Sequence, residues 1–174
     1  MARRAEEGPV PDDWFGPLIR AAVYEPDPSL NRQLVDPVRN AFGRRRVQLA
    51  LLDYLEAGSG ADAAGAARAW YWTSAPLSYV GGSTTPTPES LAEYEAVADL
   101  RQRYRHTALR RFVTDNDLDV RRCILPGLPL DPQLYPEDMR DLVARAVEIA
   151  RTSDDEYLKH RVEIQVAVHP PVPR

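Results

Sequence analysis

The sequence of 174 residues has one cysteine, no long apolar run and a single lysine, Lys159, among its 22 basic residues. One cysteine cannot form a disulfide within the chain and has no partner for a thiolate metal site, so both are excluded. The apolar runs are far shorter than the roughly 20 residues of a membrane-spanning helix. The opening segment MARRAEEGPVPDD becomes acidic and proline-rich instead of apolar, unlike a signal peptide. We therefore expect a cytoplasmic protein without a membrane partner.

Motifs of catalysis are also scarce. The three histidines, His106, His160 and His169, are scattered and form no His-x-x-x-His or His-Glu pair. There is no Gly-x-Ser-x-Gly elbow, and the segment VGGST lacks the lysine of a phosphate-binding loop. Cys123 lies in the apolar run CIL, which favours a small buried hydrophobe over a nucleophile. The sequence predicts no catalytic residue, metal site or cofactor, although active sites assembled from distant positions leave an enzyme open.

The sequence that is present predicts helices. Hydrophobic residues make up 44% and charged residues 28%, as in an ordinary globular protein, and the length suits one domain. Residues 1–12 and 169–174 are rich in proline and charge, and we expect them to be disordered. Pro37 should end or kink the second helix, whereas Thr87 and Pro88 should begin the longest one. The expected helices cover residues 12–24, 29–40, 43–58, 61–73, 87–113, 118–128, 135–150 and 155–168.

Four junctions between these helices look alike. Each has an aspartate, then a small or aliphatic residue three positions later, and usually a basic residue soon after. The four aspartates are Asp27, Asp62, Asp117 and Asp155, at intervals of 35, 55 and 38 residues. The long interval contains an irregular stretch, residues 73–90, and without it the interval falls to about 37 residues, close to the period of helix-pair repeats.

The motif Asp-x-x-Val-Arg leading into an apolar helix, at this period, resembles the HEAT repeat. The best match is TDNDLDVRRCILPGL at residues 114–128, with looser relatives in DDEYLKHRVEIQVAV and FGRRRVQLALLDYL. The second repeat departs from the pattern, because Gly65 stands where an aliphatic residue is expected. The resemblance implies an all-α fold, an α-α superhelix in the form of a short solenoid of about four helix pairs over residues 13–168. It also implies that the four aspartates act as structural caps and that Arg121 forms a rung between repeats.

A calcium site is the main alternative for residues 114–128, since Asp115, Asp117 and Asp119 alternate as in an EF-hand. Such a loop would need glycine at its sixth position and glutamate at its twelfth. Val120 and Pro126 occupy these positions. The valine does not favour the required turn and the proline supplies no ligand. We therefore interpret Asp117 as a helix N-cap.

Charged and aromatic residues provide the candidate binding surface. Arginines are concentrated between Leu100 and Leu125, at positions 101, 103, 105, 110, 111, 121 and 122. They could pair with aspartates between repeats, contact a protein partner, or line a groove for nucleic acid. Trp70, Tyr71 and Trp72 are consecutive on a helix and must point in three directions. They either form a binding surface with the loop that follows, which includes Tyr79, or pack that loop down.

The favoured function is a non-enzymatic helical-repeat module that binds a protein partner, as a scaffold or in an inhibitory or immunity-type role. One alternative is a nucleic-acid-binding protein similar to the HEAT-like DNA alkylation-repair glycosylases, which the net charge of −4 disfavours. Another is an enzyme or accessory protein of secondary metabolism that holds a small molecule in an aromatic-lined cleft. The predicted partner-binding residues are Trp70, Trp72, Tyr79, Arg101, Arg105 and Arg122.

Overall fold

The computed structural model describes residues 10–168 and is all-α. Its helices are α1 (Phe15–Tyr24), α2 (Pro28–Phe42), α3 (Arg44–Ala57), α4 (Gly60–Tyr71), α5 (Pro88–Glu95), α6 (Ala98–Thr114), α7 (Leu118–Ile124), α8 (Arg140–Thr152) and α9 (Glu156–Val168). Short 3₁₀ turns are η1 (Asp12–Trp14), η2 (Leu125–Gly127), η3 (Pro132–Leu134) and η4 (Glu137–Met139). Within residues 10–168 there is no strand, only an isolated antiparallel bridge between Tyr79 and Pro86.

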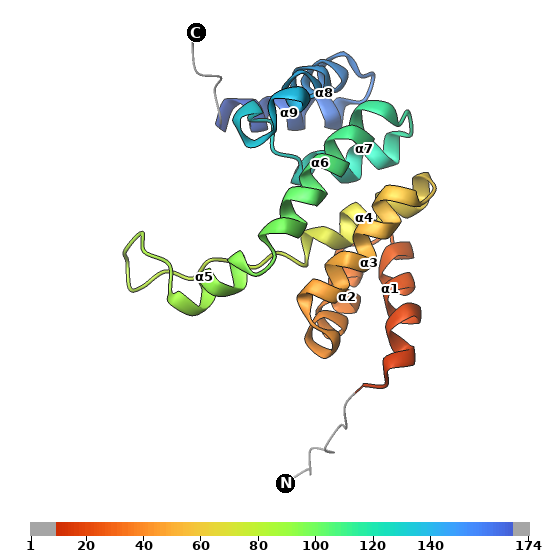
Figure 1. Cartoon of the computed structure of the whole chain (residues 1–174). Helices are drawn as coiled ribbons and strands as arrows, with labels where there is room; N and C mark the ends of the chain where they lie inside the picture. Colours follow the sequence, from red (N-terminus) through yellow and green to blue (C-terminus); the bar gives the residue numbers. More distant parts are fainter. Residues whose placement is uncertain (1–9, 169–174) are drawn as a thin grey trace.

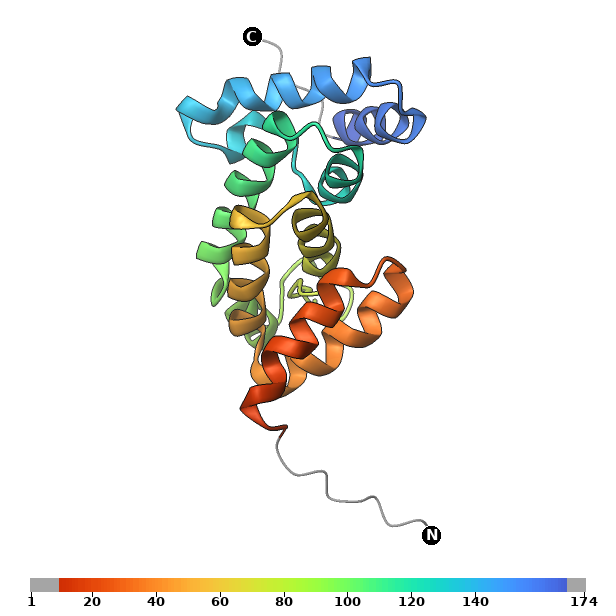
Figure 2. The same cartoon turned by 90° about the vertical axis from the view of Figure 1, so that its right-hand side faces the viewer.

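The helices pack in pairs that follow one another along the molecule, from α1 and α2 at one end to α8 and α9 at the other (Figures 1 and 2). The pairs are α1 with α2, α3 with α4, α6 with α7, and α8 with α9. The first helices of the last three pairs contact one another in the order α3, α6, α8, and the second helices in the order α4, α7, α9. This packing is consistent with the stack of helix pairs that the sequence predicts.

The four junction aspartates all lie at the start of the second helix of a pair. Asp27 caps α2 and accepts hydrogen bonds from the amides of Ser29 and Leu30 at 2.8 and 3.1 Å. Asp117 caps α7 in the same way, through the amides of Asp119 and Val120 at 2.8 and 3.4 Å. At the start of α9, Asp155 accepts from the amide of Leu158 at 3.0 Å. Each contact satisfies amides that the first turn of a helix leaves without a partner.

Asp62 departs from this pattern, because the N-cap of α4 is Ser59. Asp62 is the third residue of the helix and completes a capping box by accepting from the Ser59 amide at 2.8 Å. Its other carboxylate oxygen accepts from the Tyr24 hydroxyl at 2.6 Å. These hydrogen bonds lower the pKa of Asp62, and the one from Tyr24 has the largest effect. Asp62 therefore links α4 to the end of α1 instead of acting as the N-cap.

Pro37, which was expected to end or kink its helix, lies inside α2 and does not end it, because α2 continues to Phe42. The expected helix over residues 87–113 is divided into α5 and α6 by a break at Ala96 and Val97. Val97 is 3% exposed and has non-helical dihedral angles, φ −123° and ψ 22°. Its burial against the helical stack turns the chain, so that α5 leaves the direction of α6.

The expectations about the ends of the chain lie mostly outside the described residues, which exclude 1–9 and 169–174. Within the expected N-terminal disordered segment, however, Asp12 begins η1 and its carboxylate pairs with Arg46 of α3. Across residues 10–168, no helix combines the length and apolarity that a membrane crossing requires.

Candidate partner-binding arm

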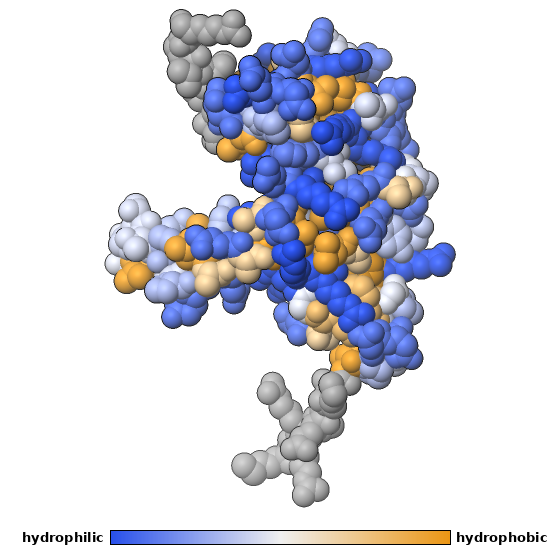
Figure 3. All heavy atoms as spheres, viewed as in Figure 1, coloured by the Kyte–Doolittle hydropathy of each residue, from blue (hydrophilic) through white to orange (hydrophobic). Residues whose placement is uncertain are grey.

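Residues 73–95, which we call the arm, project from the stacked helices between the α3/α4 and α6/α7 pairs (Figure 1). The arm consists of an irregular segment followed by α5. No residue of α5 is buried. In the space-filling view the arm is a narrow projection with apolar residues at its tip and along one side (Figure 3). Within the arm only Thr73 and Ala75, at its base, are buried, and a connection this long that projects from the core calls for a functional explanation.

Hydrogen bonds from α2 and α3 fix the start of the arm. The Thr73 side chain is fully buried, and its hydroxyl donates to the carbonyl of Trp70 at 2.7 Å. Gln48 donates to both oxygens of Thr73 at 3.2 and 3.3 Å. Arg44 donates to the carbonyls of Thr73 and Ser74 at 2.5 and 2.6 Å, and Arg39 donates to that of Trp72 at 3.0 Å. Three side chains thus bind consecutive backbone carbonyls, which sets the direction in which the arm leaves the stack.

The other end of the arm is fixed by Arg45 and Arg101. Arg45 donates to the carbonyl of Ala96 at 3.2 Å and makes a two-pronged contact with the Asp99 carboxylate at 2.6 and 2.9 Å. The guanidinium of Arg101 lies 3.5 Å from the centroid of the Tyr94 ring and donates to the Tyr94 carbonyl. Arg101, predicted to bind a partner, therefore supports the arm instead of presenting a free charge.

The arm is also ordered internally. The Ser78 amide donates to the Ser90 hydroxyl, which donates back to the Ser78 carbonyl, both at 3.1 Å. The Thr87 amide donates to the same carbonyl at 2.7 Å, and the Thr87 hydroxyl caps α5. The tip turns at Gly82, whose φ of 74° favours glycine. The tip and α5 therefore hold each other in place without contacts to the core.

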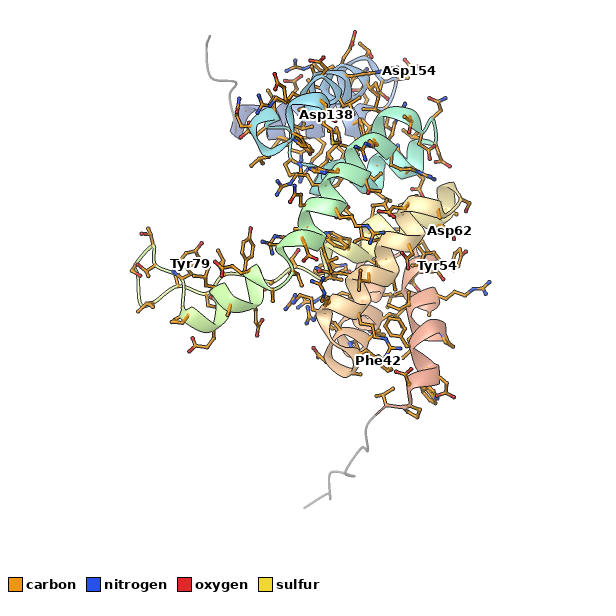
Figure 4. The ribbon with its side chains drawn as sticks, viewed as in Figure 1. Phe42, Tyr54, Asp62, Tyr79, Asp138 and Asp154 are labelled. Atoms are coloured by element: carbon orange, nitrogen blue, oxygen red, sulfur yellow. The ribbon has the colours of Figure 1, made fainter. Side chains whose placement is uncertain are left out.

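This ordered element exposes apolar side chains. Tyr79 is 54% exposed, Val80 53% and Leu91 36%. Figure 4 shows Tyr79 on the arm, well away from the helical stack. At the base of the arm, Tyr71 and Trp72 contact each other edge to face, with ring centroids 4.9 Å apart. Beyond the base the arm projects from the stack, so the hypothesis that aromatic residues pack this loop down is wrong there. Tyr79 is therefore available to a partner.

Between the base of the arm and α2 lies an open groove of about 800 Å³. Its walls include Trp72 and three arginines, one of which, Arg32, lies 5.2 Å from the Trp72 ring centroid. Each arginine of the groove pairs with an acid: Arg32 with Asp36 at 3.2 Å, Arg39 with Asp36 at 3.0 Å, and Arg44 with Glu93 at 3.6 Å. The groove is therefore polar and aromatic without a strong positive charge.

The other predicted binding residues lie apart from the arm. Trp70 is 8% exposed and stacks on Tyr104, with ring centroids 4.2 Å apart. Arg105 donates to the Leu134 carbonyl at 3.1 Å. Arg122 forms an ion pair with Asp155, the residue at the start of α9. Of the six residues predicted to bind a partner, only Trp72 and Tyr79 belong to the groove and arm.

The contact between repeats that was expected of Arg121 is made by Arg122, which was expected to bind a partner. Arg121 donates to the Phe112 carbonyl at 3.2 Å and to Asn116 at 3.3 Å, both within the α6/α7 pair, so it is not a rung between repeats. Arg122 instead joins α7 to α9 through Asp155. The reason is geometric, since consecutive helical residues point about 100° apart and only Arg122 faces the next pair.

The seven arginines of residues 100–125 all contact other groups of the chain. Besides the four already described, Arg103 pairs with Glu56 at 2.6 Å, Arg110 approaches the Met139 sulfur at 3.7 Å, and Arg111 donates to the Gly58 carbonyl at 3.0 Å. Three of the seven, Arg103, Arg111 and Arg122, pair with acids, whereas the other four contact only uncharged groups within residues 10–168.

The residues that fix the arm were missed from the sequence, although one signal was present. Arg44, Arg45 and Arg46 are consecutive at the start of α3, where the helix dipole disfavours positive charge. Such a run indicates that each arginine has a partner elsewhere. The three point in different directions, to the base of the arm, to Asp99 and to Asp12.

The contact between Arg45 and Asp99 can be tested by titration. The hydrogen bond from Arg45 lowers the pKa of Asp99 from 3.8 to about 2. The pKa of Asp99 is lower in the folded than in the unfolded state, so the contact stabilises the fold fully at pH values above the unfolded-state pKa. This stabilisation is lost as the pH falls through the folded-state pKa. In carboxyl-detected NMR we expect Asp99 to titrate near pH 2 and, in Arg45→Gln, at a clearly higher pH, although the backbone hydrogen bonds of Leu100 and Asp99 still lower its pKa. An unchanged titration would contradict this anchor of the arm.

No cluster of three or more His, Cys, Asp or Glu side chains in residues 10–168 is arranged to hold a metal ion. A comparison of the chain with known protein families, with curated proteins and with solved structures finds no similar protein.

Proposed function

We propose that this chain is a non-enzymatic, HEAT-like helical-repeat module that binds a protein partner through its arm. The observation that carries the proposal is an ordered arm, fixed at both ends, that holds Tyr79, Val80 and Leu91 exposed. Exposed apolar side chains on a defined element are typical of protein interfaces, where aromatic residues contribute most. Scaffold, inhibitory and immunity-type roles would all use such a surface. We propose the cytoplasm as its location, where the lone Cys123 stays reduced.

The arm supports a protein partner better than nucleic acid. Nucleic-acid binding depends on unpaired positive charge that can replace counterions on phosphates. The arginines of the groove pair with acids, as do three of the seven arginines of residues 100–125, and the net charge is −4. A binding surface made of tyrosine, valine and leucine side chains would instead bury apolar area on a protein.

The test compares capture by the full chain with capture by two surface variants. Val80→Asp/Leu91→Asp charges the arm, whereas Ile164→Asp charges a side chain of α9 that is 43% exposed and lies outside the arm. We expect the wild type and Ile164→Asp to retain the same partner from an extract of the source organism, and the arm variant to lose it. With the purified partner, calorimetry should show at least about a ten-fold weaker Kd for the arm variant, as for interface positions that cost more than 1 kcal/mol.

All three proteins should unfold at similar temperatures, because surface substitutions usually change stability by no more than about 0.5 kcal/mol. The proposal would be overturned if the arm variant and Ile164→Asp captured every protein of the extract equally well. Binding of labelled duplex DNA that weakens steeply with salt would favour the nucleic-acid alternative instead.

A further inference from the structure

A second hollow, separate from the arm, lies where α4, α6, α7 and η2 meet. It is a pocket of about 260 Å³ with mainly apolar walls. Its walls include Trp70, Trp72, Tyr104, Cys123, Gly127 and Tyr157. These residues come from three helix pairs, with Trp72 at the C-terminal end of α4, so the pocket exists only in the folded stack.

The inner wall of this pocket carries a polar group that no part of the described chain satisfies. The rings of Tyr104 and Trp70 are stacked almost in parallel, 4.2 Å apart with an angle of 5°. Tyr104 is 5% exposed as a whole residue, but its hydroxyl oxygen is not fully buried, and it makes no hydrogen bond within residues 10–168. The hydroxyl lies next to Gly127, because a Cβ atom added to this glycine would be 3.8 Å from it. The pocket wall beside the hydroxyl is therefore backbone without a side chain. A hydroxyl that faces an open pocket can bond water or a ligand, so it offers a ligand in this pocket one directional hydrogen bond.

The charges around the pocket favour a neutral ligand. Burial raises the pKa of the Tyr104 hydroxyl far above its usual range, so the group remains a hydrogen-bond donor. Burial also raises the pKa of the Cys123 thiol, which keeps it uncharged. The two arginines at the rim are balanced by acids, Arg68 by Asp119 at 3.7 Å and Arg122 by Asp155. A net charge on the ligand would therefore find no free counter-charge.

We infer that this pocket binds a small, neutral, planar aromatic molecule that accepts a hydrogen bond from the Tyr104 hydroxyl. The flat aromatic walls provide contacts for rings, and the hydroxyl provides one directional contact. An engineered apolar cavity of about 150 Å³ binds benzene. The present pocket is larger, which suits a fused two-ring molecule. The site is distinct from the arm, so it stands or falls independently of the proposed protein partner.

The experiment uses two probes of nearly identical shape, quinoline and naphthalene. Only quinoline has a ring nitrogen that accepts a hydrogen bond, and it is uncharged at neutral pH. Titrations of the full chain, followed by ligand and protein NMR, give Kd for each probe. We expect quinoline to bind roughly five-fold more tightly, the ratio given by a typical net hydrogen bond. The indole signals of Trp70 and Trp72 should shift, whereas that of Trp14, 57% exposed in η1, should not.

Two variants make the test decisive. Tyr104→Phe keeps the stacked ring and removes the hydroxyl, so it should bind both probes equally. Gly127→Leu places a side chain next to the hydroxyl and should abolish binding of both probes. If Gly127→Leu does not fold, Gly127→Ala is used instead, and it should weaken binding in part. Absence of wild-type binding at millimolar probe, a quinoline preference that survives Tyr104→Phe, or an equal shift of Trp14 would each overturn the inference.

Discussion

Gly65→Ala is expected to destabilise the protein by about 3 kcal/mol or more, at the upper end of the cost of overpacking a core. A Cβ at Gly65 would lie 1.9 Å from the carbonyl oxygen of Val23 and 2.8 Å from its carbonyl carbon. Both atoms belong to the backbone of α1, so no side-chain rotation relieves the clash, and α1 must move away from α4. Alanine favours a helix over glycine by only about 1 kcal/mol, which offsets a minor part of the cost.

The position of α4 makes this displacement costly. Seven of its twelve residues are buried, five of them alanines, and it packs against α1, α2, α3 and α7. Small side chains let these helices approach closely. A movement of α1 away from Gly65 therefore also opens the contacts of α2, which packs on α1 and α4.

Gly16→Ala is the matched control, because it makes the same chemical change in α1 where a Cβ would meet no atom within 4 Å. It should leave stability unchanged or raise it by up to about 1 kcal/mol. Urea unfolding followed by circular dichroism gives both values. Equal midpoints for the two variants would contradict the close approach of α1 and α4.

Gly65 also illustrates what could be predicted from the sequence and what could not. Local signals were sufficient for most of the helices and for three of the four junctions, since Asp27, Asp117 and Asp155 lie at helix starts and cap them through their own neighbours. The glycine at position 65 was a departure from the repeat pattern with no evident cause. Its cause is the backbone of Val23, 42 residues earlier, and no local pattern contains that contact.

The arm was predicted in part. The irregular stretch at residues 73–90 was recognisable by composition, but the break at Val97 was not, because the helical periodicity continues from Tyr94 to Phe112. Tertiary contacts decide the break: Val97 is buried, and Arg45 of α3 holds the Ala96 carbonyl. The pocket beside Tyr104 was equally hidden, since its walls come from five separate helices and η2.

Phe112→Ala should cost about 3–5 kcal/mol, the range for a buried phenylalanine reduced to alanine. Phe112 of α6 is fully buried and is among the largest such side chains of the core. The guanidinium of Arg121 lies 6.0 Å from its ring centroid and donates to its carbonyl, so the loss also loosens α7. Phe15→Ala is the control: this ring is only partly buried, at the end of the stack, where it contacts Phe42 at 5.2 Å. Phe15→Ala should lower the free energy of unfolding by less than half as much as Phe112→Ala.

The shape of the unfolding transition carries further information. Stacked repeats are stabilised mainly by contacts between neighbours, and a weak interface lets one end unfold before the other. The α4–α7 and α3–α6 contacts join the two halves of this stack extensively. Phe112→Ala should therefore lower the midpoint of a single transition seen equally by circular dichroism and tryptophan fluorescence, because Trp14, Trp70 and Trp72 all lie in the N-terminal half. Separate transitions, with ellipticity and tryptophan fluorescence changing at different midpoints, would show that α6–α9 unfolds as an independent unit.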